Sequence, residues 1–199
     1  LAAFTTGSAV SKKRRLIHIG WREGAGSICL RLFVSEPEQK SEGEGEKMQG
    51  IKILCVGKVK ESYFRDGIAH FITQIRKKCP VEIIECADEP TPDGASEAEE
   101  DKIRRTEGER LLQKISDGDY VVALCIDGAH YASEAWKERI QKRSRQTAGA
   151  LIFVIGGSLG LSDAVVRRAN EKLSFSAMTF PHQMMRMILC EQLAEVFAD

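Results

Sequence analysis

The chain has 199 residues, enough for one domain or for one domain with a tail. Hydrophobic residues make up 43% of it, which is ordinary for a globular protein, and no run approaches the roughly 18–20 apolar residues of a membrane span. Lys plus Arg and Asp plus Glu each number 29, so the formal net charge is zero. This balance excludes a strongly basic general nucleic-acid binder but leaves room for a local basic patch.

Six cysteines are scattered along the chain, with no C-x-x-C pair and no histidine at zinc-ligand spacing. Most lie inside apolar runs, which is typical of reduced core cysteines in a cytoplasmic protein, and we expect no metal. They are Cys29, Cys55, Cys79, Cys86, Cys125 and Cys190.

Residues 1–47 differ in composition from the rest. Residues 12–15 are all basic, and residues 35–47 are polar, charged and interrupted by glycine and proline. Such a stretch cannot bury enough apolar surface to offset the entropy lost on ordering. We therefore interpret residues 1–47 as a disordered or non-native extension, with an organellar leader as the alternative, and residues 48–199 as the domain.

The first half of this domain alternates between strand and helix patterns. Residues 51–56 form an apolar strand stopped by Gly57, and residues 61–78 carry apolar side chains at helical spacing. Residues 81–86 alternate as a half-buried strand does, and the acidic, proline-bearing residues 87–101 are expected to be a loop.

The second half continues the alternation. A charged helix ends near Ile115, a strand covers residues 120–126, and a helix covers residues 133–146. Residues 151–155 are a buried strand, and residues 173–180 are a second strand-like run. The pattern predicts an α/β fold with a mainly parallel sheet covered by helices on both faces.

Ligands of open α/β sheets bind beyond the carboxyl ends of the strands, and three such ends can be named. They are residues 124–128, the turn at Gly156-Gly157 and residues 176–180. Glycine allows the main chain to approach a ligand closely, and Ser162 then caps a helix. A plain strand-to-helix turn is the alternative reading.

Phosphate-binding motifs are missing from these turns. The fingerprint G-x-G-x-x-G fails because Ile155 stands where its first glycine belongs, and Gly57-Lys58 lacks the upstream glycine of a P-loop. The turns therefore suit a nucleoside-like ligand held by main-chain groups, and an NAD-dependent oxidoreductase is a weak alternative.

The last helix is predicted to begin at Pro181, whose missing N–H costs nothing at a first helical position. His182 and Arg186 are four residues apart and share one side of it. In one interpretation they belong to a capped helix start, and the arginine is solvated. In the other, both side chains face a substrate, and the arginine neutralises a phosphate or a developing negative charge.

These segments closely resemble the ribosomal RNA large-subunit methyltransferase H family, which belongs to the SPOUT class of S-adenosylmethionine-dependent methyltransferases. The resemblance covers about Met48 to Leu193. It is carried by residues 51–60, 107–112, 155–160, 173–186 and 191–193.

The resemblance implies a C-terminal deep trefoil knot, which is a rare exception to unthreaded topology, with a pocket for S-adenosyl-L-methionine at its crossings. Main-chain groups and apolar contacts would hold this cofactor. The residues implied are Leu124, Gly156, Phe175, Ser176, Ala177, Met178, Thr179 and Phe180.

The implied substrate is a pseudouridine of 23S rRNA in the assembled ribosome, methylated at N3 by a homodimer without membrane or metal. The chemistry is a direct displacement, so the protein mainly positions the reactants. His182 and Arg186 are the candidates to orient RNA or to ease loss of the N3 proton.

The match fails near the carboxyl end. Ala194 and Glu195 stand where family members have Tyr and Arg, and the chain stops at Asp199 without the family's terminal Tyr-His. We expect a truncated or frame-shifted chain that keeps the fold but is impaired in methyl transfer. A degenerate knotted protein that binds ribosome or cofactor without turnover is the alternative.

Overall fold

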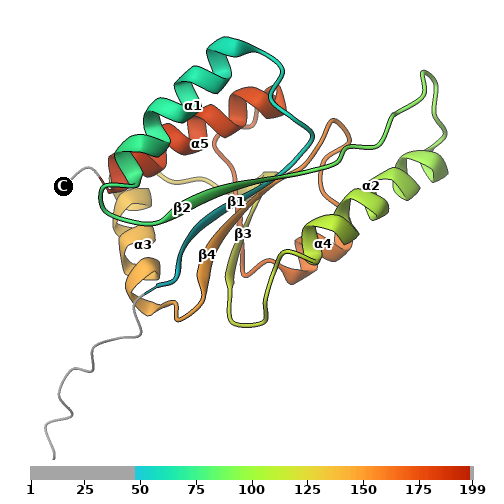
Figure 1. Ribbon diagram of the computed structural model, residues 1–199. Helices are drawn as coiled ribbons and strands as arrows, with labels where there is room; N and C mark the ends of the chain where they lie inside the picture. The colour runs from blue at the N-terminus through green and yellow to red at the C-terminus, as the bar shows by residue number, and fades with distance from the viewer. Residues whose placement is uncertain (1–47, 198–199) are drawn as a thin grey trace, which may run out of the picture. The chain divides into compact units, whose positions relative to one another are not determined.

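The computed structural model describes residues 48–197, which contain a five-stranded sheet with helices on both faces (Figure 1). All strand pairs are parallel, and the strand order is β2-β1-β4-β3-β5. The strands are β1 (Gly50–Val56), β2 (Val81–Cys86), β3 (Tyr120–Ala129), β4 (Ala150–Ile155) and β5 (Glu171–Leu173). The helices are α1 (Ser62–Ile75), α2 (Glu97–Leu112), α3 (Ser133–Gln146), α4 (Asp163–Arg168) and α5 (His182–Val196).

The helices divide between the two faces according to the direction of each crossover. Figure 1 shows α1, α3 and α5 on one face of the sheet and α2 and α4 on the other. Helices α1 and α3 each lead to a strand nearer the β2 edge of the sheet, and both lie on the first face. Helices α2 and α4 each lead to a strand nearer the β5 edge, and both lie on the second face. A single crossover hand requires this division.

Alternate side chains of the central strands enter two separate cores. Ile51 and Ile53 of β1 pack with α1, α3 and α5, whereas Leu54 and Val56 pack with α2 and α4. Every residue of β4 is buried, which explains its unbroken apolar sequence. The two cores anchor the strands whose carboxyl ends form the site.

The structure confirms the predicted α/β fold and corrects some boundaries. The acidic loop ends earlier than residue 101, because the Ser96 side chain accepts the Glu99 N–H and the Glu99 carboxylate accepts the Ser96 N–H. This capping box starts α2 at Glu97.

Further corrections concern the site itself. β3 runs beyond residue 126 to Ala129, and β5 ends at Leu173, so most of the strand-like run 173–180 is irregular. Pro181 is the N-cap of α5 rather than its first residue.

The interpretation of residues 1–47 lies outside the described residues. Within residues 48–197, no helix combines the length and apolar character needed to cross a membrane. The same residues contain no group of three or more His, Cys, Asp or Glu side chains arranged to hold a metal ion.

Candidate functional site

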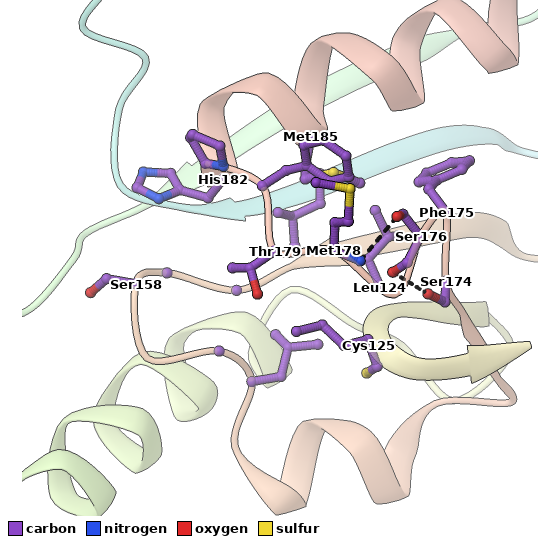
Figure 2. Close-up of a pocket in the computed structure, with 18 of the residues that line it drawn as sticks. Leu124, Cys125, Ser158, Ser174, Phe175, Ser176, Met178, Thr179, His182 and Met185 are labelled. Carbon is purple, nitrogen blue, oxygen red and sulfur yellow. Dashed lines mark hydrogen bonds between the residues drawn. The ribbon is translucent and has the colours of Figure 1, made fainter.

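A cavity of about 680 Å³ opens at the carboxyl ends of β3 and β4 (Figure 2). Three segments of the chain line it. They are residues 124–126 at the end of β3, residues 155–161 after β4, and much of the segment from Leu173 to Met185. The sequence predicted that these strand ends would lie together, and the structure brings them to one cavity.

The turn after β4 presents main chain to the cavity. A Cβ atom on Gly156 would lie 2.6 Å from the carbonyl carbon of Gly160, so only glycine allows this close approach. Gly160 itself has a positive φ of 83° and donates its N–H to the Gly157 carbonyl at 3.2 Å. Because Gly156, Gly157 and Gly160 carry no side chains, the main chain of the turn lines the cavity at these positions.

The wall that precedes α5 is folded by short local hydrogen bonds. The Ser174 hydroxyl donates to the Ser176 carbonyl at 3.0 Å, and the Met178 N–H donates to the Ser176 hydroxyl at 3.0 Å (Figure 2). The ring of Phe175 meets Trp136 of α3 edge to face, with centroids 6.1 Å apart. This wall is consequently held both by its own polar groups and by the core.

Predicted cofactor residues lie in this cavity with one exception. Seven of them, which are Leu124, Gly156, Phe175, Ser176, Met178, Thr179 and Phe180, contribute to the lining. Ala177 does not, although it belongs to the same segment. Their contact with a cofactor stays a prediction.

Three lining residues were named from the sequence only as parts of strand ends and turns, not as cofactor residues. They are Cys125, Ile126 and Gly157. Met185 enters from the first turn of α5. Gly157 and Gly160 carried a visible signal, since both stand in the glycine turn. Among the described residues, no Asp, Glu, Lys or Arg lines the cavity, so it suits a ligand held by apolar and main-chain contacts.

His182 begins α5 and lines the cavity. Burial lowers the pKa of its imidazole below the ordinary value, and the positive charges of Arg186 and Lys60 lower it further against the opposing charge of Asp88. The ring is therefore neutral near neutral pH. A neutral imidazole at this place is able to accept a proton or a hydrogen bond from a substrate.

Arg186 does not line the cavity, and its side chain has no exposed surface. Its guanidinium donates to the carbonyls of Val56 at 2.5 Å and Gly57 at 2.9 Å, and to Glu85 Oε1 at 3.1 Å. The predicted role in contacting RNA stays untested. In this structure Arg186 ties α5 to the ends of β1 and β2.

A second set of bonds fixes the loop after β1. Glu85 Oε1 also accepts the Val59 N–H at 3.2 Å, and Gln183 of α5 accepts the Lys60 N–H at 2.9 Å. The start of α5 is therefore bonded to the segment after β1 at two residues: Gln183 contacts Lys60, and Arg186 contacts Gly57. The first turn of α5, which carries His182, is therefore fixed by the hydrogen bonds of Gln183 and Arg186.

The sequence of the chain is similar to those of known proteins. The family model described as "Predicted SPOUT methyltransferase" matches residues 48–197. The chain is 46% identical over 147 residues to the ribosomal RNA large subunit methyltransferase H of Streptococcus thermophilus (strain CNRZ 1066), over 74% of this chain and 92% of that protein. The protein of the same name from Streptococcus pneumoniae (strain CGSP14) matches with equal identity and coverage. The family match includes every segment that lines the cavity.

Proposed function

Because the chain belongs to the SPOUT methyltransferase family, we propose that it transfers a methyl group from S-adenosyl-L-methionine to N3 of a pseudouridine in 23S rRNA. The name of these relatives supports a large-subunit rRNA as the substrate. The observation that carries the proposal is the cavity at the ends of β3 and β4, where main-chain groups and apolar side chains converge.

The residues present fit this cofactor. A volume of about 680 Å³ is within the range of small-molecule sites, and a lining without cationic side chains suits a positively charged sulfonium. Peptide groups of the Gly156–Gly160 turn and of the segment before α5 offer donors and acceptors for an adenine edge. When bound, the cofactor supplies an electrophilic methyl group.

His182 is the candidate that acts on the substrate. N3–H of a uracil-type base is a weak acid, and a neutral imidazole at the cavity edge is suited to hold or accept that proton. Arg186 has a different role in the proposal, because it is fully buried and bonded to β1. It positions His182 one helical turn away.

A homodimer acting on assembled ribosomes in the cytoplasm belongs to the same proposal. Two apolar side chains at the cavity, Met178 and Ile126, are 70% and 57% exposed. A second copy that covers them would also help to complete the RNA site. Light scattering coupled to gel filtration measures the mass in solution, and a monomer at micromolar concentration would contradict this part.

The trefoil knot is a further part of the proposal. Leu173 pairs with both Leu124 and Ala129, so the register between β3 and β5 shifts over residues 125–128. The chain then returns from this edge strand to pack α5 against α1. Pulling single molecules by their ends should leave an extended length shorter than that of an unknotted chain.

The central experiment pairs cofactor binding with turnover. Isothermal titration with S-adenosylmethionine should show one site per chain, and ribosomes lacking the modification should gain one methyl group at N3 of a pseudouridine, as mapped by mass spectrometry. Absence of binding, or methylation of another atom, would contradict the proposal. A cavity variant, Thr179→Trp, serves as the matched negative control.

The alternative of binding without turnover is supported by two residues of α5. Ala194 is only 4% exposed, and the neighbouring Glu195 is exposed, where the family pattern has an aromatic and a cation. Binding of S-adenosylmethionine with no methylated product would favour this alternative. Recovery of product by Ala194→Tyr with Glu195→Arg would then assign the defect to these positions.

A further inference from the structure

The glycine turn after β4 is contacted from outside the cavity by two consecutive residues of α2. We name residues 156–162 the β4–α4 loop. Glu107 of α2 lies against Gly157 near one end of this loop, and Gly108 lies against Ser162 at the other. The mechanism proposed above does not use this Glu-Gly pair.

Gly157 shows how close the first contact is. A Cβ atom built on Gly157 would lie 3.1 Å from Glu107 Oε2 and 3.1 Å from Val56 Cγ1. The side-chain direction of Gly157 therefore points at Glu107, and its main chain is what lines the cavity. The carboxylate forms the support behind that main chain.

Gly108 makes the second contact possible. A Cβ atom on Gly108 would lie 2.1 Å from the Ser162 hydroxyl oxygen, which accepts the Val165 N–H and caps α4. The missing side chain lets α2 approach the loop at its helix-capping residue. Loop position is thus defined at both ends by one turn of α2.

Glu107 is a costly residue to place there for stability alone. It is 5% exposed, and no salt bridge joins it to a cation among the described residues. Burial raises the pKa of its carboxyl, and the charges of Asp88 and Glu89 raise it further against the Glu89 N–H bond and the charge of Arg110. A buried carboxylate without an ionic partner is a cost to folding.

We propose that Glu107 is a positioning residue for cofactor binding: its side chain holds the β4–α4 loop, acting through Gly157, in the shape that receives the methyl donor. This inference rests on the proposed function, because it assigns the cavity to S-adenosylmethionine. Oε1 is anchored by the Glu89 N–H at 3.0 Å, which leaves Oε2 directed at the loop.

The test uses Glu107→Ala and Glu107→Gln in the full chain, with Glu109→Ala as the matched control on the exposed side of the same helix. Titration with S-adenosylmethionine should show affinity reduced about tenfold by alanine and largely retained by glutamine, which keeps the shape and an acceptor oxygen. KM for the cofactor should rise with kcat at saturation unchanged. The control should match the wild type.

Hydrogen exchange of the free protein separates this inference from the proposed function. In Glu107→Ala, the amides of residues 157–160 should exchange faster, while those of β4 should not change. If the wild type does not bind S-adenosylmethionine, the proposed function fails, and the exchange result still decides whether Glu107 holds the loop. A folded Glu107→Ala protein with wild-type affinity and exchange would overturn the inference.

A coupling experiment adds a second criterion. Gly157→Ala should weaken cofactor binding, because the added methyl group meets both Glu107 and Val56. Removing Glu107 frees one side of this contact, so Gly157→Ala should cost less affinity in the Glu107→Ala background than in the wild type. If the losses of affinity in the two single variants simply add in the double variant, the effect of Glu107 does not act through its contact with Gly157.

Discussion

Replacing Arg186 tests whether this residue holds the fold at the site or takes part in the chemistry. Arg186→Met leaves the carbonyls of Val56 and Gly57 without their donor and deprives Glu85 of a partner. The two carbonyls dominate the cost, because Glu85 is 34% exposed and is able to turn to water. We expect a loss of about 3 kcal/mol in the free energy of unfolding.

This magnitude is large for one side chain, since domain stabilities are roughly 5–15 kcal/mol. Arg186→Lys should lose less, about 1–2 kcal/mol, because an ammonium keeps the charge but not the planar fork that reaches three acceptors. Some of the loss is offset in both variants, because the Arg186 Nε already lacks a hydrogen-bond partner in its buried position.

Urea unfolding measures the effect through the midpoint concentration, provided that the slope is unchanged. Arg105→Ala is the matched control, because Arg105 is 73% exposed and pairs with Asp101 across one turn of α2; its effect should stay within about 0.5 kcal/mol. An Arg186→Met protein as stable as the wild type would refute this reasoning, since the carbonyls of Val56 and Gly57 would then not depend on the Arg186 donor.

Three other outcomes follow from the site. Gly156→Ala should reduce affinity for S-adenosylmethionine about 100-fold in a titration, because its methyl group would lie 2.7 Å from the Gly160 oxygen; unchanged affinity would contradict the need for glycine. His182 should remain neutral below its ordinary pKa of 6.5, so the wild-type pH profile of kcat/KM should fall only on the acid side of that value, and His182→Gln should lack this limb. Burial raises the pKa of the Glu107 carboxyl, so the folded state binds the carboxyl proton more tightly than the unfolded state does. The protein therefore loses stability as the pH rises above 4.5, the ordinary pKa of a glutamate. Thermal melts should then show Glu107→Gln gaining on the wild type between pH 4.5 and neutral pH, and a difference independent of pH would count against this linkage.

Local sequence patterns were sufficient for the elements with one strong periodicity. β4 is apolar at every position, and α1 repeats its apolar residues at helical spacing, so both were predicted from the sequence. The start of α2 was missed, although Ser96 and Glu99 form a recognisable capping box. Here the acidic, proline-bearing composition was given more weight than the cap.

Contacts distant in sequence were beyond local reasoning. Arg186 is bonded to Val56 and to Glu85, which are 130 and 101 residues away, and nothing near Arg186 distinguishes a buried arginine from a solvated one. Glu107 and Gly157 are closer in sequence, but they too belong to different elements that no local pattern connects. The cavity lining, by contrast, followed from the rule that parallel strands end at one edge of the sheet.

The path of the chain after β5 explains why the cavity lies over β3 and β4. β5 is at the sheet edge beside β3, whereas α5 packs against α1, so the connecting residues 174–181 must pass the strands between them. They cross at the carboxyl ends, where the turn after β4 and the extension of β3 meet them. The end of β1 does not contribute to the cavity in the same way, because the carbonyls of Val56 and Gly57 accept hydrogen bonds from Arg186. One helix therefore closes the β1 end with Arg186 and presents His182 to the cavity, which makes the position of His182 depend on the contacts of Arg186.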